Sequence, residues 1–236
     1  MTANEFEKEF QLLRDELYAA TLSWHTYLTV HNEAHQDESL LSAMNQHPSF
    51  WLVTLRALQH NTILVLGRLF DNDPRARTIR AFVRACANHP EIFTQEALRA
   101  RRIRNDAGVL KTDWFEGWIE KAFAPDAAHL KTLETQADEC LAIWRSGCND
   151  LRNKIVAHHE RLSKQVLDEI YGKTKVGDVT TLIRRLYVIE HAIQELHTNG
   201  RPLEFALKVN PRVTEAEQAA KGTLARLKKG TFGLCS

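Results

Sequence analysis

The sequence has little glycine and proline, with 10 Gly and 6 Pro among 236 residues. Because both residues mark turns, their scarcity disfavours sandwiches and barrels and favours long helices. The chain also lacks any run of about twenty apolar residues, so we expect no segment that spans a membrane. Its acidic, amphipathic N-terminus has no apolar signal core, and we therefore expect a cytoplasmic protein.

Neither sign of charge is in excess, because 31 basic and 30 acidic side chains leave a formal net charge of +1. A chain without a global positive field is not drawn to nucleic acid as a whole, so any binding of RNA or DNA must come from a local patch. Hydrophobic residues make up 44% and charged residues 26%, which is typical of a globular protein. The length suits one large helical domain, or a domain with a smaller appendage.

Cysteine motifs are missing too, since Cys86, Cys140, Cys148 and Cys235 form no CxxC pair. Their scatter favours a reduced cytosolic protein over a disulfide framework. His31 and His35 have the spacing of a zinc-binding pair, but no third ligand matches them, which favours a solvated helix end. We therefore expect no metal and no other cofactor.

Helical periodicity is the strongest pattern that is present. Apolar residues at spacings of three and four predict helices over 4–31 and about 178–199, and residues 50–70 predict the most apolar helix, ending at a stop signal at 71–74. Further helices are expected at 76–88, 97–104, 114–123, 127–145 and 214–229, and a short helical piece at 166–171 is expected inside a loop over 160–177. The sequence thus predicts an all-α, multi-helix bundle with long antiparallel helices and extra peripheral ones. We expect a helical domain over 1–200, and over 201–236 an extended segment with a C-terminal helix on or beside it.

The charged and aromatic residues of these helices could have either functional or structural roles. Arginines gather at 75–84 and at 99–104, where they could follow a phosphate backbone, although solvated faces and ion pairs are the commoner use. The aromatic residues of 114–123 favour core or dimer packing over base stacking. On the apolar helix, Arg68 and the following Asp71 are the polar groups that a site could use, because buried polar groups need partners or a cleft.

One short stretch, residues 152–160 (RNKIVAHHE), gathers the groups best suited to chemistry. It holds a guanidinium, an amide and two imidazoles, separated by apolar residues that can pack against a core. In a straight α-helix a residue seven positions on lies about 20° from the first, while one six positions on lies about 120° away. Arg152 would then share a face with His159 rather than His158, unless the helix ends near Ala157.

The pattern Arg152-Asn153-x-x-x-x-His158 resembles the motif of the HEPN superfamily, helical proteins of prokaryotic defence and toxin systems. Leu151 before the arginine and residues 155–157 before the histidine also resemble the residues found around that motif. Residues 61–71 resemble the abortive-infection U-type branch of the superfamily, and this resemblance would cover most of the chain. Active members of the superfamily are metal-independent ribonucleases whose sites form where two copies of the motif face each other in a homodimer. Other members have lost activity and serve as binding partners.

The resemblance implies a role for each residue of the motif. Arg152 would clamp a phosphate, Asn153 would position the phosphate or the imidazole, and His158, which follows the small Ala157, would transfer protons. His159 is the alternative imidazole, and Arg68 and Asp71 are possible additions to the site. Metal-free RNA cleavage needs a base for the 2′-hydroxyl proton, an acid for the leaving oxygen and a cation for the phosphate, which His and Arg supply.

These residues lead to three hypotheses. The first is a metal-independent endoribonuclease of a phage-defence or toxin–antitoxin system, acting on RNA as a homodimer, with an antitoxin or regulatory protein as a further partner. The second is a catalytically inactive HEPN-like module that binds RNA or a protein. The third is an unrelated helical structural protein whose Arg and His are ordinary surface groups.

Overall fold

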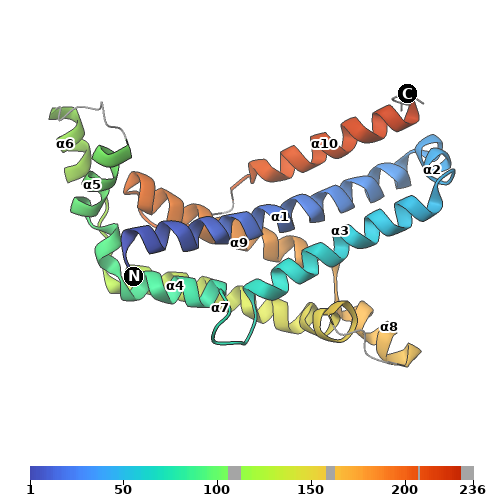
Figure 1. Ribbon diagram of the computed structural model, residues 1–236, viewed down its shortest axis with the longest axis horizontal. Coiled ribbons are helices and arrows are strands. Elements are labelled where there is room, and N and C mark those ends of the chain that lie inside the picture. The colour runs from blue at the N-terminus through green and yellow to red at the C-terminus, as the bar shows by residue number, and fades with distance from the viewer. Residues whose placement is uncertain (106–112, 158–162, 207, 230–236) are drawn as a thin grey trace. The chain divides into compact units, whose positions relative to one another are not determined.

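The computed structural model describes residues 1–105, 113–157, 163–206 and 208–229, most of which are helical (Figure 1). No β-strand occurs among these residues, so the all-α prediction is confirmed. The longest helices are α1 (Ala3–Gln36), α3 (Pro48–Leu69), α7 (Ala127–Gly147), α9 (Val176–Asn199) and α10 (Pro211–Lys228). The shorter ones are α2 (Glu38–Met44), α4 (Ile79–Asn88), η1 (Pro90–Phe93), α5 (Gln95–Asn105), α6 (Asp113–Glu120), η2 (Leu151–Ala157) and α8 (Lys164–Lys173).

Of the short helices, α2 and η1 were not predicted, and α8 is longer than the helical piece expected there. Both α2 and α8 begin at a capping side chain. The carboxylate of Asp37 accepts hydrogen bonds from the first backbone N–H groups of α2. Ser163 does the same for α8, where only a short helical piece inside a loop was expected. Because a cap satisfies backbone donors that a helix start leaves open, it stabilises helices too short to show a clear apolar period.

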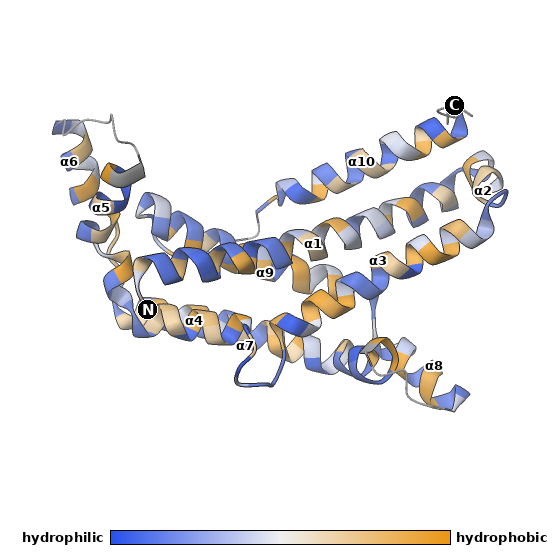
Figure 2. Cartoon of the chain, in the orientation of Figure 1, coloured by the Kyte–Doolittle hydropathy of each residue, from blue (hydrophilic) through white to orange (hydrophobic). Residues whose placement is uncertain are grey.

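The chain packs as two compact units, each assembled from separate stretches. Unit 1 consists of Met1–Arg14, Arg68–Ser146 and Arg184–Lys208. Unit 2 consists of Asp15–Gly67, Gly147–Ile183 and the segment that begins at Val209. Apolar and polar residues alternate around the long helices in both units (Figure 2), as amphipathic helices require.

The core of unit 1 is rich in aromatic rings. Phe6 of α1 packs against Phe82 of α4 and Phe93 of η1, with ring centroids 5.6 and 5.5 Å apart. Elsewhere in this unit Phe70 stacks on the fully buried Trp144, with 5.6 Å between centroids. Fully buried aromatic rings dominate the energetics of a core, so these contacts anchor the unit.

In unit 2 the helices α1 and α3 are joined through α2, and α10 lies along α1 (Figure 1). The amide of Asn61 donates to the hydroxyl of Ser23 across α3 and α1, at 2.8 Å. The Tyr18 hydroxyl of α1 donates to Glu215 of α10, at 2.7 Å. Apolar residues of α1, α2 and α10 form a common core: Val30, Leu40, Met44, Ala220 and Leu224.

The cysteines of the described residues are buried free thiols. Cys86 and Cys140 belong to unit 1, and Cys148 belongs to unit 2. Burial raises the pKa of all three thiols, because a thiolate is poorly solvated in an apolar interior. In the described part of the chain, no helix has the length and apolar character needed to cross a membrane.

Candidate functional site

Arg152 and Asn153 lie on η2, a π-helix. A π-helix closes hydrogen bonds between residues five apart, is rare, and frequently marks functional sites. Its turn is wider than that of an α-helix, so the helical-wheel prediction that pairs Arg152 with His159 does not apply to this segment. His158 and His159 lie outside the described residues, and the choice between them stays a prediction.

The side chain of Arg152 is held from one side by its neighbour. Its Nη1 donates to Oδ1 of Asn153 at 2.7 Å, and Nδ2 of Asn153 donates to Oδ1 of Asn149 at 3.3 Å. Asn153 was expected to position a phosphate or an imidazole, and in the structure it orients the guanidinium. A chain of amides that ends on a guanidinium restricts how that group can turn.

On its other side Arg152 packs against α3 at Gly67. A Cβ atom at Gly67 would lie 2.8 Å from Cγ and 2.9 Å from Nε of Arg152, so a side chain there would displace the arginine. Gly67 is therefore a functional candidate that the sequence analysis missed. The available signal was an isolated glycine inside the most apolar helix, since such a glycine often marks a close approach.

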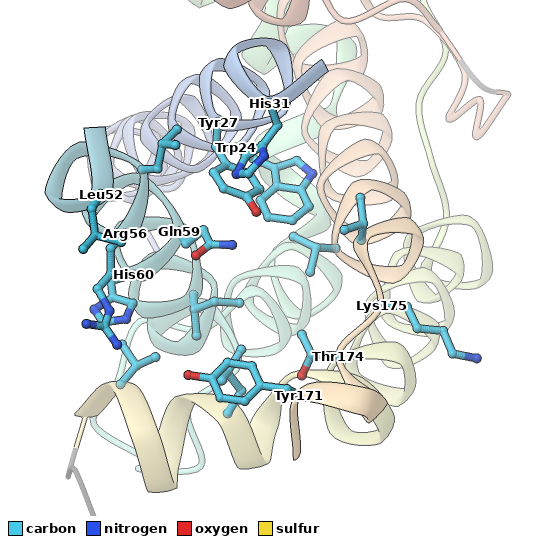
Figure 3. Close-up of a pocket in the computed structure, with 16 residues that line it drawn as sticks. Trp24, Tyr27, His31, Leu52, Arg56, Gln59, His60, Tyr171, Thr174 and Lys175 are labelled. Atoms are coloured by element: carbon cyan, nitrogen blue, oxygen red, sulfur yellow. The ribbon is translucent and has the colours of Figure 1, made fainter. Parts of the chain in front are cut away.

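Beside the motif, unit 2 contains a cavity of about 480 Å³. Leu151 and Val156 of η2 form part of its wall. Figure 3 shows Trp24, Tyr27 and His31 of α1 together along one side, with Gln59 of α3 pointing into the space. Tyr171 and Thr174 lie on the opposite side, while the ammonium group of Lys175 points away from the cavity.

Burial changes the ionisation of two side chains of the cavity. It lowers the pKa of His31 below its ordinary value, because the imidazolium is poorly solvated there. It raises the pKa of Tyr27, although a hydrogen bond with the Gln59 side chain acts in the other direction. At neutral pH the cavity therefore offers an uncharged imidazole, a phenol and an amide, each of which can donate and accept hydrogen bonds.

Arg68 and Asp71 belong to unit 1, whereas Arg152 and Asn153 belong to unit 2. Arg68 is exposed in the last turn of α3. Oδ1 of Asp71 accepts the backbone N–H of Asp73 at 2.9 Å, which stabilises the turn after the helix. That these two residues share a site with Arg152 stays a prediction.

Most arginines of the two basic clusters have carboxylate partners in unit 1. The pairs are Arg75 with Asp73, Arg77 with Glu9, Arg80 with Asp138, Arg84 with Glu134 and Arg99 with Glu116. Arg101 is buried and donates to the backbone oxygens of Ile92 and His197 at 2.6 and 2.8 Å, so it holds the fold together. These contacts favour ion pairing and structural roles for the clusters over tracking of a phosphate backbone.

The aromatic helix α6 divides between core and surface. Phe115 and Ile119 are buried in a small core of unit 1, while Trp114 is 73% exposed. Trp118 lies partly buried against that core, with the guanidinium of Arg102 5.3 Å from its ring centroid. Core packing therefore accounts for most of this helix. Within the described residues, no three His, Cys, Asp or Glu side chains gather as a metal site would require.

The model of a known protein family matches nearly the whole chain. The family model HEPN_AbiU2, described as AbiU2, matches residues 3–212, a range that includes Gly67 and the entire motif. No curated protein and no solved structure shows a significant match to the sequence. The resemblance inferred from the motif is thus confirmed at the level of the family: the chain belongs to the AbiU2 family of HEPN abortive-infection proteins.

Proposed function

We propose that the protein is a metal-independent endoribonuclease of an abortive-infection system, active as a homodimer with its site at the η2 motif. The observation that carries the proposal is the fixed position of Arg152, held between Asn153 and Gly67 on a π-helix. A guanidinium fixed in this way can bind a phosphate with little loss of conformational freedom. In the sequence, His158 follows it by six positions and supplies a group that transfers protons near neutral pH.

The reaction requires two proton transfers at one phosphodiester. His158 of one protomer removes the 2′-hydroxyl proton, and the oxygen attacks the adjacent phosphorus. The bond to the 5′-oxygen of the next nucleotide breaks, and that oxygen takes a proton from His158 of the partner subunit. The products are a 2′,3′-cyclic phosphate and a 5′-hydroxyl, and DNA is not cut because it lacks the 2′-hydroxyl.

Arg152 stabilises the charge that develops on the phosphate oxygens. A guanidinium has five N–H donors, so donation to Asn153 is compatible with donation to a phosphate. Two-fold symmetry places two such sets at one interface, and this supplies both an acid and a base.

Cleavage of a mixed RNA pool in EDTA tests the proposal. We expect the wild-type protein to cut, and Arg152→Ala and His158→Ala to lose activity by roughly 10²–10³-fold, as for loss of a group that stabilises the transition state. Lys154→Ala is the matched control, because Lys154 lies on η2 and pairs with Asp150 outside the motif pattern. His159→Ala should retain activity if His158 is the working imidazole.

Each variant must have the helical content and the dimer mass of the wild-type protein, so that a lower rate of RNA cleavage cannot result from misfolding or dissociation. A well-folded wild-type dimer that cuts no RNA would contradict the nuclease proposal. Cutting that survives both Arg152→Ala and His158→Ala would place the activity elsewhere or in a contaminant.

One observation favours a second candidate, an inactive HEPN module that binds a protein such as an antitoxin or regulator. The first turns of α3 expose Phe50, Leu52 and Val53 by 61, 67 and 67%. Adjacent exposed apolar side chains are typical of protein-interaction surfaces. Wild-type protein that fails to cut RNA in EDTA or in Mg²⁺, yet forms a stable complex through this surface, would establish this candidate in place of the nuclease.

A further inference from the structure

We propose that the cavity of unit 2 binds one nucleotide of the RNA strand beside the cleaved bond, with its base on the aromatic wall of α1 and a phosphate at Arg56 and His60. This inference rests on the proposed ribonuclease function and names a subsite for its substrate.

The size and the lining of the cavity suit a nucleotide. Its volume of about 480 Å³ falls within the roughly 300–1,000 Å³ typical of small-molecule sites. It is mainly apolar, with a few polar groups that converge on the space (Figure 3). Such a lining holds a flat, partly polar group better than a hydrocarbon chain or a fully hydrated ion.

One wall is a group of rings. The rings of Trp24 and Tyr27 stack with centroids 5.5 Å apart, and His31 lies edge-on to Tyr27 at 4.6 Å. Aromatic walls bind any base by stacking, because every base has a π-face. Gln59, also in the wall, has an amide that can exchange hydrogen bonds with a base edge.

The polar groups at the mouth of the cavity favour binding of an anion. Arg56 and His60 lie one turn apart on α3, so both face the same mouth. The residues that line the cavity include no Asp or Glu. Arg56 is exposed and, unlike the paired arginines of the two basic clusters in unit 1, forms no ion pair with any described residue. Its guanidinium is therefore available to a phosphate.

The cavity also lies next to the motif. Leu151 and Val156, on either side of Arg152 and Asn153 in the sequence, are in its wall. On α3, Ile63 lines the cavity one turn before Gly67, which touches Arg152. A nucleotide bound there would lie beside the phosphate assigned to Arg152, as a subsite adjacent to the reacting bond requires.

Binding of adenosine 5′-monophosphate, measured by calorimetry in EDTA, tests the proposal without any cleavage. Adenosine and inorganic phosphate are separate probes, and we expect the monophosphate to bind more tightly than either. Arg56→Gln should weaken binding of the monophosphate roughly tenfold or more and leave adenosine unchanged. Tyr27→Leu should weaken both roughly tenfold through lost stacking, whereas Tyr27→Phe keeps the ring and should stay close to wild type.

Two controls make the result specific. Arg145→Gln removes an exposed arginine of unit 1 and should not change binding. A short RNA with a 2′-O-methyl group at each nucleotide resists cleavage and should displace the monophosphate. Failure of this RNA to compete would overturn an RNA subsite and identify a site for free nucleotides.

The outcomes also separate this inference from the proposed function. Monophosphate binding that depends on Arg56 and Tyr27, in a protein that cuts no RNA, would remove the ribonuclease and leave the nucleotide site. RNA cleavage without such binding would overturn the subsite and leave the ribonuclease. Equal affinity for adenosine and its monophosphate, or equal losses in Arg56→Gln and Arg145→Gln, would also overturn it.

Discussion

At the scale of single residues, the environment of Arg152 depends on an atom that is absent. Gly67 has no Cβ, and this allows the arginine to lie against α3. An arginine is a long, flexible side chain, and its contact with Gly67 and the hydrogen bond to Asn153 limit its rotamers. We therefore assign Gly67 and Asn153 as positioning residues for the proposed phosphate clamp.

Gly67→Ala should impair cleavage more than it impairs folding. Its Cβ would meet Cγ and Nε of Arg152 at 2.8 and 2.9 Å, so either the arginine or the helix must move. We expect a loss of activity of about 10²-fold, as for a misplacement of about 1 Å, with a stability change of no more than about 1–3 kcal/mol. RNA cleavage rates and urea unfolding measure the two effects.

Gly222→Ala on α10 is the matched control, because a Cβ there meets no atom within 4 Å. Alanine in that helix should raise stability by up to about 1 kcal/mol and leave cleavage unchanged. Equal activity in the two alanine variants would show that α3 does not position Arg152.

At the scale of elements, the long helices were predictable and the short ones less so. The apolar periods of α1, α3, α7 and α9 are long enough to identify them, because each buries one face. The start of α2 depends on Asp37 and that of α8 on Ser163, and a single cap is a weak signal in a sequence.

The site shows the same division. The pattern of Arg152 and His158 could be recognised in the sequence, because the motif is local. The π-helical form of η2 could not, since the residue spacing does not reveal a change from four-residue to five-residue hydrogen bonding. The isolated Gly67 is visible in the sequence, but its approach to Arg152 could not be predicted, and neither could the role of the cavity residue Tyr27. Both depend on the packing of helices that are far apart in the sequence.

The helix α1 carries two histidines with lowered pKa values, the partly buried His25 and the more exposed His31, and they predict how stability depends on pH. Burial lowers the pKa of both, although the nearby Glu217 acts in the opposite direction on His25. The unfolded chain, with histidine pKa values of about 6.5, then binds more protons than the folded chain. Stability from the neutral imidazoles is therefore present above about pH 6.5 and is lost as the pH falls.

Urea unfolding at pH 7.5 and 5.5 measures this effect. The wild-type protein should be less stable at the lower pH, and the doubly substituted His25→Gln/His31→Gln protein should lose less stability over the same interval. His47→Gln, in the connection between α2 and α3, is the control and should keep the wild-type difference. An unchanged pH dependence in the double variant would contradict the prediction.

At the scale of the whole molecule, the proposed reaction needs two copies of the chain. If each bond is cut with His158 from both protomers, a dimer with one His158→Ala chain is inactive. Mixing equal amounts of wild-type and His158→Ala protein, with free exchange of subunits, should give about one quarter of the activity of wild-type protein at the same total protein concentration. Activity that falls only to about one half would show that each protomer works by itself.

The buried thiols make it possible to measure how often different parts of the chain open locally. Cys86 and Cys140 lie within unit 1, and Cys148 lies within unit 2 with its carbonyl oxygen bound to the N–H of Arg152. A buried thiol reacts with an alkylating reagent only after its surroundings open. The alkylation rate of each cysteine therefore reports how often the structure around it opens. With Cys235 replaced by serine, the order of alkylation would reveal whether the two units open together, and how often the turn that begins the motif helix comes apart.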